Sequence, residues 1–284
     1  MSKLETFYYP ETIEEAIELL SEESRKSAVI AGGSTLSLVK DPTIEALVDL
    51  TRAGMNYIRE NNGGLVLGAT TVIQDIFKSE ACENYADGIL SEAASTMASR
   101  PLRNVITVGG NLVASRVWSD LPPVLMAMDA IIKVKGVEEK EFSAEEFYQQ
   151  RPVKLLQKNE VVTQVEFPPA GDKSGATFIK FSKTKGDYSI INVACYLELE
   201  ENTCKKARIV ASAAVNLPIR FKEAEAKLEG SEITAELIAE VAGMCSDEIE
   251  PLSNLWGTAE YKKKLTRNLV CRALSECLEK ANNK

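Results

Sequence analysis

The sequence predicts a mixed α+β protein with two N-terminal parts and a separate C-terminal domain. In the first 170 residues, stretches of apolar residues at helical spacing alternate with strand-like stretches. After a segment rich in proline and glycine, three strand-like stretches precede three helical ones, which is typical of an α+β domain. With 284 residues, the chain is long enough for two or three domains. We expect parts at residues 1–55, 56–170 and 175–284, the last with a three-stranded sheet and helices.

The first part is predicted to be a small βαβ unit. Thr12 and Glu15 have the spacing of a capping box at the start of a helix. Apolar residues then recur on one helical face, at Ile13, Ala16, Ile17 and Leu20. The apolar run at 28–31 predicts a buried strand that stops at two glycines, and a second strand is expected near residues 44–50.

The second part begins after the turn at residues 61–64. Strands are expected at 65–69, 130–134 and 161–167. Thr71 and Gln74 resemble a second capping box, before a helix that runs to Phe77. Further helices are expected at 92–98 and 121–128, where Pro122 is tolerated in the first turn. Residues 105–112 are expected to be irregular.

Residues 168–175 are the best linker candidate. Beyond them, strands are expected at 177–182, 190–199 and 207–215. Helices are expected at 222–228, 235–245 and 259–279.

Charge and composition exclude several classes of function. The chain has 42 acidic and 33 basic residues and a formal net charge of −9, so it lacks the basic surface of a non-specific nucleic-acid binder. It has no histidine, which excludes Ser-His-Asp triads, Cys-His dyads, histidine metal sites and histidyl-linked flavin. Any chemistry must use carboxylates, amines, thiols, backbone groups or a bound cofactor.

The cysteines and the apolar segments indicate a compartment. The six cysteines, at positions 82, 195, 204, 245, 271 and 277, include no C-x-x-C pair. An iron–sulfur cluster needs four thiolates at close spacings, so we expect no cluster on this chain but reduced, structural thiols. The chain begins without an apolar signal segment, and no stretch approaches 18 apolar residues. We therefore expect a cytoplasmic protein without a membrane segment.

Two glycine-containing segments are candidates for binding a phosphate or pyrophosphate. Residues 31–36 (A-G-G-S-T-L) follow a predicted strand, and successive N–H groups in such a turn form an anion-binding concavity. This segment is neither a Walker loop nor G-x-G-x-x-G. Residues 107–112 (T-V-G-G-N-L) again combine a hydroxyl, two glycines and an amide. Each segment alone could be an ordinary turn, but a long diphosphate cofactor needs more than one segment to hold it.

Two further groups could act beside such a cofactor. Ser119-Asp120 could accept hydrogen bonds from sugar or polyol hydroxyls, or could cap the helix that follows. Lys180, Lys183 and Lys185 could form a solvated edge. Alternatively, one of these lysines could stabilise the negative charge that a flavin gains near N1 on reduction.

Together these motifs resemble the FAD-binding medium subunit of the molybdenum hydroxylases, the family of xanthine dehydrogenase and the carbon monoxide dehydrogenase flavoprotein. Residues 31–36 resemble the family's A-G-G-T-D-L, and 67–71 (L-G-A-T-T) its I-G-A-x-T. Residues 102–111 (L-R-N-V-I-T-V-G-G-N) are similar to I-R-N-x-A-T-x-G-G-N, and Ser119-Asp120 follows at the expected distance. Residues 178–180 (F-I-K) resemble the F-x-K that opens the C-terminal domain.

The resemblance implies a two-part FAD-binding region of the vanillyl-alcohol-oxidase (PCMH) type and a C-terminal domain of the carbon monoxide dehydrogenase flavoprotein type. It implies that the backbone of 31–36 and 107–111 holds the FAD diphosphate, that Asp120 contacts ribityl hydroxyls and that Lys180 lies near the isoalloxazine. Val162 would lie at the flavin ring or the adenine wall, with Met97 and Ala98 in the same cavity. The implied FAD-binding residues are Ala31, Gly32, Gly33, Ser34, Thr35, Leu36, Met97, Ala98, Leu102, Ile106, Thr107, Gly109, Gly110, Asn111, Ser119, Asp120, Val162 and Lys180.

The resemblance also implies an electron-relay function. Electrons would arrive from [2Fe–2S] clusters on a small partner subunit and leave through FAD to NAD⁺, while a molybdopterin-binding large subunit hydroxylates the substrate. A dimer of heterotrimers is the assembly that the family suggests. The absence of cysteine clusters here is consistent with iron–sulfur centres on another chain.

Three departures from the family pattern leave alternatives open. Ser34-Thr35 stands where Thr followed by Asp or Glu is usual, so one carboxylate contact is missing. Arg116-Val117-Trp118 precedes Ser119 where proline is common, and Thr184-Lys185 replaces a double arginine. The alternatives are a stand-alone flavin-dependent reductase of the same fold and an interaction subunit that has lost FAD.

Overall fold

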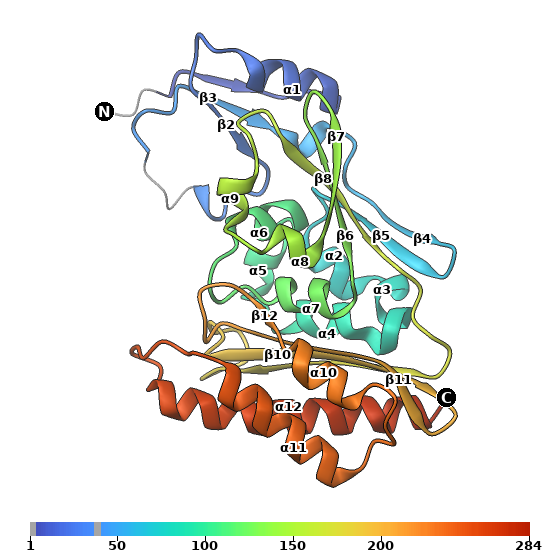
Figure 1. Ribbon diagram of the computed structural model, residues 1–284. Coiled ribbons are helices and arrows are strands. Elements are labelled where there is room, and N and C mark those ends of the chain that lie inside the picture. The colour runs from blue at the N-terminus through green and yellow to red at the C-terminus, as the bar shows by residue number, and fades with distance from the viewer. Residues whose placement is uncertain (1–3, 37–40) are drawn as a thin grey trace.

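The described residues form three β-sheets that follow one another along the molecule (Figure 1). The computed structural model describes residues 4–36 and 41–284. A sheet of three strands lies at the N-terminal end, a sheet of five strands follows, and a sheet of four strands lies at the C-terminal end. The fold is mixed helix and sheet, as predicted. We propose that these sheets correspond to domains at 1–55, 56–170 and 175–284.

The first sheet is parallel, and among the described residues one helix packs against it. Its order is β1 (Thr6–Tyr8), β3 (Ala46–Asp49) and β2 (Ser27–Ile30). Helix α1 (Ile13–Ser21) begins as predicted, because the Thr12 side chain accepts a hydrogen bond from the Glu15 N–H. The capping box is only half formed, because the Glu15 carboxylate accepts a hydrogen bond from the N–H of Glu11 and not from that of the N-cap residue, Thr12.

The prediction that the strand near residues 28–31 is buried was wrong. In β2 the side chain of Val29 is 37% exposed, and Ala28 and Ile30 are half-buried. Val29 and Ile30 line a cavity, so the apolar residues of this strand face a space rather than a protein core.

The second sheet is antiparallel and carries most of the helices. Its order is β4 (Ile58–Asn61), β5 (Gly64–Gly68), β8 (Val161–Phe167), β6 (Ile131–Lys135) and β7 (Glu139–Ser143). The helices are α2 (Ile73–Lys78), α3 (Glu80–Asn84), α4 (Ile89–Thr96), α5 (Arg100–Arg103), α6 (Val108–Ala114), α7 (Leu121–Ala127), α8 (Ala144–Phe147) and α9 (Pro152–Leu155). Strands β4 and β7 and helices α3, α5, α8 and α9 were not predicted.

Three local predictions in this part were wrong. Thr71 does not cap α2, because its hydroxyl exchanges hydrogen bonds with the backbone of Tyr57. The helix expected at 92–98 begins and ends earlier, and Ala98 lies outside it with φ of 44°. Residues 105–112 are not irregular throughout, since Thr107 caps α6, whose first turn contains Gly109 and Gly110.

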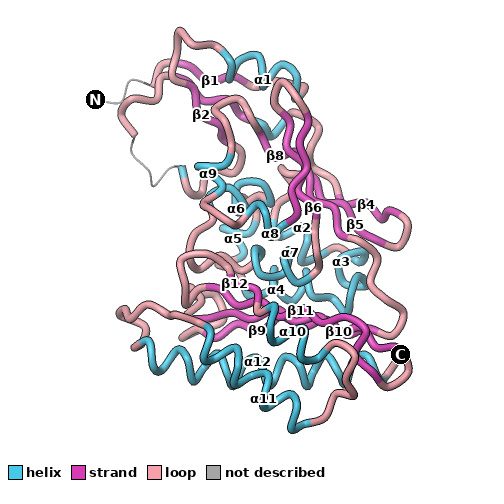
Figure 2. Tube along the Cα trace, viewed as in Figure 1, coloured by secondary structure: helices cyan, strands magenta, loops and turns pink. Residues whose placement is uncertain are grey.

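The third sheet has helices on both faces (Figure 2). Its antiparallel order is β12 (Ile219–Arg220), β11 (Thr203–Ser212), β10 (Ile191–Glu200) and β9 (Ser174–Phe181). The three predicted strands are present, and the two-residue β12 extends them. The predicted helices are also present, as α10 (Lys222–Leu228), α11 (Ala235–Glu248) and α12 (Ala259–Asn282).

Alternation along the strands of the third sheet divides the apolar core into two clusters. Phe178 and Ala194 face α4 and α7, whereas Ile179 and Val193 face α10, α11 and α12. Side chains on a strand point alternately to opposite faces, so these strands are apolar on both faces. The third sheet therefore shares one core with the second part of the chain.

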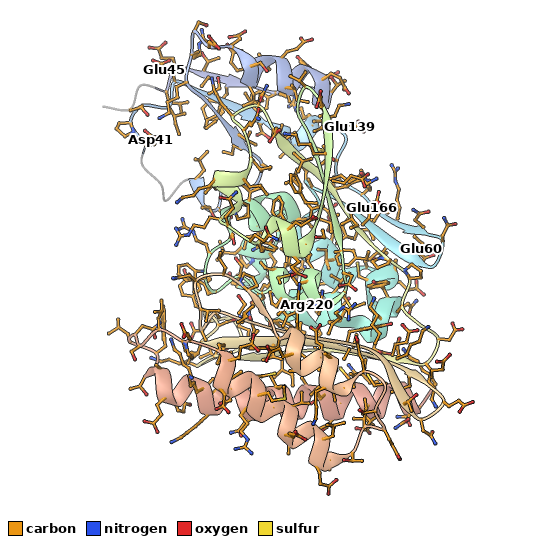
Figure 3. All side chains as sticks on the ribbon, viewed as in Figure 1. Asp41, Glu45, Glu60, Glu139, Glu166 and Arg220 are labelled. Atoms are coloured by element: carbon orange, nitrogen blue, oxygen red, sulfur yellow. The ribbon has the colours of Figure 1, made fainter. Side chains whose placement is uncertain are left out.

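Charged side chains complete this junction. Asp87 and Glu92 accept hydrogen bonds from the N–H groups of Ala176 and Phe178, at 3.0 and 3.4 Å. These bonds satisfy N–H groups on the edge of β9 that no other strand covers. At the other edge, Arg208 and Arg220 contact Asp129, which follows α7. The ribbon places Arg220 between the two layers (Figure 3).

The described residues contain no metal-binding cluster of three or more Cys, Asp or Glu side chains. All six cysteines are free thiols, and five of them are buried. No helix in the described ranges is long and apolar enough to cross a membrane.

The contact between β9 and α12 predicts an effect on stability. A Cβ at Gly175 would lie 1.9 Å from the Cys277 carbonyl oxygen, so we expect G175A to lower the free energy of unfolding by about 1–3 kcal/mol. Gly243 is the matched control, because a Cβ there meets nothing within 4 Å and alanine favours a helix. Urea unfolding followed by circular dichroism measures both. Equal stability of G175A and the wild type would contradict this packing.

Candidate functional site

Two cavities meet at the first glycine segment. The larger, of about 1330 Å³, is lined by all three parts of the chain, from Leu4 to Tyr188. The smaller, of about 430 Å³, is lined by the first and second parts. Residues 32–36 line both cavities, together with Gly110. The site therefore has two compartments with a glycine segment between them.

Every residue that the resemblance implies to bind FAD lines one of these cavities. The larger cavity alone is lined by Met97, Ala98, Leu102, Ile106, Asn111, Ser119, Asp120 and Lys180. The smaller alone is lined by Ala31, Thr107, Gly109 and Val162. Both are lined by Gly32, Gly33, Ser34, Thr35, Leu36 and Gly110.

The first glycine segment packs tightly and has N–H groups without partners among the described residues. A Cβ at Gly32 would lie 1.4 Å from the carbonyl oxygen of Val105, so only glycine fits there. Gly33 has φ of +66°, which favours glycine. Among the described residues, the backbone N–H groups of 32–35 donate no hydrogen bond to the protein. These groups and the hydroxyls of Ser34 and Thr35 are available to an anionic ligand.

The second glycine segment has a different role from the first. The N–H groups of Val108 and Gly109 donate to the carbonyls of Thr71 and Ala69, and the N–H of Gly110 donates to the Thr107 hydroxyl. A Cβ at Gly109 would lie 3.0 Å from the Cβ of Ala69. The glycines thus let α6 approach the chain after β5, and much of their backbone hydrogen bonding is internal.

Two buried oxygens in the cavity walls have no partner within the protein. They are Asn111 Oδ1, in the larger cavity, and Thr70 Oγ1, in the smaller. Buried polar atoms in proteins are usually hydrogen-bonded, so each suits a polar ligand. The residues present therefore fit a two-ended cofactor with polar groups in both compartments.

A buried ion pair forms part of the wall of the larger cavity. Lys180 Nζ lies 3.0 Å from Asp120 Oδ2, and each side chain is only 4% exposed. Ser189 and Asn192 donate to the other carboxylate oxygen, Asp120 Oδ1. Lys180 also donates to the Thr96 carbonyl at 2.9 Å. The two charges are therefore paired and hydrogen-bonded, which burial requires.

These contacts bear on the alternatives that the sequence left open. Asp120 is the N-cap residue of α7, but its side chain makes no capping hydrogen bond and pairs with Lys180 instead. Burial raises the pKa of Asp120, and the Lys180 ammonium and the Ser189 and Asn192 donors oppose that rise. Of the three lysines, only Lys180 lines the cavity, whereas Lys183 and Lys185 are exposed.

Sequence reasoning missed several residues of the site. Ser189 and Asn192 gave no signal, because they reach Asp120 only through the pairing of β9 with β10, in which Asn192 lies opposite Lys180. Trp118 and Tyr188 also line the larger cavity, with their ring centroids 4.3 Å apart. Trp118 belongs to the segment 116–118, which departs from the family pattern that the sequence resembles, and that departure was the only available signal.

Known families and proteins match nearly the whole chain. The model of the FAD binding domain in molybdopterin dehydrogenase matches residues 2–170, and the carbon monoxide dehydrogenase flavoprotein C-terminal domain matches 176–277. The chain is 30% identical, over 95% of its length and 93% of the relative, to the 6-hydroxypseudooxynicotine dehydrogenase complex subunit alpha of Paenarthrobacter nicotinovorans. It is 26% identical to the carbon monoxide dehydrogenase medium chain of Hydrogenophaga pseudoflava, over 95% of each chain.

The solved structures agree with the sequence relatives. A chain of carbon monoxide dehydrogenase from Hydrogenophaga pseudoflava matches with a TM-score of 0.92 at 26% identity, over 99% of each chain. The fold and the paired cavities thus define an FAD-binding subunit of an oxidoreductase. The chain belongs to the molybdenum hydroxylase family, among subunits of the carbon monoxide dehydrogenase medium-chain type.

The buried ion pair predicts strong coupling between two substitutions. Either D120N or K180M alone leaves one buried charge unpaired, so we expect each to lower the free energy of unfolding by about 3 kcal/mol. The double variant removes both charges, so its loss of unfolding free energy should be smaller than the sum of the losses in the two single variants. Urea unfolding of all four proteins at pH 7 measures the coupling. Additive losses would show that the two charges do not depend on each other.

Proposed function

We propose that this chain passes electrons through FAD, from [2Fe–2S] clusters on a small partner subunit to NAD⁺. Hydroxylation would take place on a separate molybdopterin-binding large subunit, in a dimer of heterotrimers. The proposal rests on the pair of cavities that meet at residues 32–36. Each residue that the resemblance implies to bind FAD lines at least one of these two cavities.

The shape and chemistry of the cavities suggest how FAD is bound. The free N–H groups of 32–35 would hold the diphosphate where the cavities meet. The larger cavity, with Asp120, Asn111 and Lys180, would take the ribityl chain and the isoalloxazine. The smaller cavity, with Val162 and the Thr70 hydroxyl, would take the adenosine end.

Hydrogen-bond capacity at the ion pair fits these roles. Asp120 Oδ1 already accepts two hydrogen bonds and Oδ2 accepts one, so a carboxylate with about two acceptor sites per oxygen has one left for a ribityl hydroxyl. Lys180 uses two of its three N–H donors. Bound FAD would supply the redox chemistry, and the Lys180 charge would favour its reduced, more negative form.

The composition of the chain supports the need for partners. The described residues hold no cluster of metal ligands, so an iron–sulfur donor would have to be another chain. The relatives are named as a medium chain and as a subunit of a dehydrogenase complex. Six free thiols are consistent with a reducing compartment, and we propose the cytoplasm.

The two alternatives have less support. An interaction subunit without FAD rests on Ser34-Thr35, yet the hydroxyls and N–H groups there still line both cavities. A stand-alone reductase would need a substrate-activating group beside the flavin. Among the described residues that line the larger cavity, Asp120 is the only buried acid, and it is paired with Lys180.

Loss of flavin in a glycine variant tests FAD binding. In G32A the new methyl group would force the first segment away from Val105, so we expect FAD affinity to fall at least about 100-fold. The wild type and the G243A control should retain FAD, with absorption near about 450 nm after gel filtration. Retention of FAD by G32A would contradict the placement of the diphosphate, and a wild type that stays colourless with added FAD would contradict the function.

The electron acceptor is tested separately. If NAD⁺ is the acceptor, NADH should reduce the bound flavin by the reverse reaction, and absorbance near about 450 nm should fall under anaerobic conditions. Dithionite serves as the positive control for reducible flavin. Reduction by dithionite without reduction by NADH would exclude NAD⁺ and leave FAD binding intact.

A further inference from the structure

Helix α4 ends at the wall of the larger cavity. Thr96 is its last residue, and both Met97 and Ala98 line the cavity. Ala98 has φ of 44°, which is unfavourable for a residue with a Cβ atom. The last carbonyl groups of a helix also carry partial negative charge. The strained backbone at Ala98 and the partial negative charge at the end of α4 both require stabilising contacts from other parts of the chain.

Two cationic side chains supply that support. Lys180 donates to the Thr96 carbonyl, and Arg103 Nη1 donates to the carbonyls of Met97 and Ala98, at 3.1 Å each. Three consecutive carbonyl groups are therefore each bonded to a cation. Lys180 is already part of the buried ion pair, whereas Arg103 has no assigned role.

Arg103 is itself held in place by α2. Its Nε donates to the side-chain oxygen of Gln74 at 3.1 Å, and its guanidinium lies 5.4 Å from the ring centroid of Phe77. The planar guanidinium can make these bonds and the ring contact at once, which a lysine ammonium cannot. Arg103 thus fixes the 97–98 turn against α2.

We propose that Arg103 is a positioning residue for the flavin end of the cofactor, an inference that rests on the proposed function. Arg103 is not among the residues that line the larger cavity, so it acts through the 97–98 turn. It holds the strained turn in the shape that lines the cavity. Its charge also offsets the carbonyl groups that would otherwise disfavour a ligand that becomes more negative on reduction.

The test compares FAD with ADP, because ADP would occupy only the smaller cavity and the segment between the two. In the full-length chain, we expect R103Q to weaken FAD binding at least tenfold, with ADP binding changed less than twofold. The midpoint potential of the FAD that remains bound should shift to more negative values. R103K keeps the positive charge but not the planar guanidinium. Compared with R103Q, it should therefore restore the midpoint potential more fully than the FAD affinity.

Arg59 provides a matched control for the loss of a stacked arginine. Arg59 lies on β4, an edge strand, and its guanidinium is 4.2 Å from the ring centroid of Tyr57. Arg59 does not line either cavity. R59Q should therefore match the wild type in FAD affinity, ADP affinity and potential.

Three results would overturn the inference. Wild-type FAD affinity and potential in R103Q would show that Arg103 does not position the flavin end. Equal weakening of FAD and ADP would indicate a general structural defect. A change in R59Q as large as that in R103Q would show that any stacked arginine has this effect. A wild type that binds ADP but not FAD would instead overturn the proposed function, and the inference with it.

Discussion

The buried ion pair between Asp120 and Lys180 joins two distant parts of the chain at the wall of the larger cavity. Asp120 precedes α7 in the second part, and Lys180 lies on β9 in the third. Burying two charges is costly, and here Ser189 and Asn192 donate further hydrogen bonds to Asp120, while the Thr96 carbonyl accepts one from Lys180. Packing of the C-terminal sheet and the shape of the cofactor site therefore depend on the same contact.

The first part of the chain is joined to the second by the close approach of Gly32 to the Val105 carbonyl. That approach leaves the N–H groups of 32–35 free of the protein and directs this segment toward both cavities. The second glycine segment serves packing, since its N–H groups bond to Thr71 and Ala69. The site thus takes N–H groups that are unpaired among the described residues from the first part, much of its wall from the second and its buried lysine from the third.

Local patterns were sufficient for much of this architecture. Helix α10 and strand β8 have the predicted bounds. The helical start of α6 was missed, since glycines at 109 and 110 are poor helix formers and the helix is fixed by contacts with Ala69. Ser189 and Asn192 could not be predicted as partners of Asp120, because they lie 69 and 72 residues away and meet it only through tertiary packing.

The central claim is that one FAD spans both cavities, with its two ends in separate compartments. Competition between riboflavin and ADP on the purified chain tests this most directly, because ADP carries both phosphates of FAD and riboflavin carries none. The account predicts that riboflavin and ADP bind together without displacing each other, that FAD displaces both, and that FAD binds far more tightly than either fragment. Mutual displacement of riboflavin and ADP, or FAD affinity no higher than that of riboflavin, would contradict the two-compartment site.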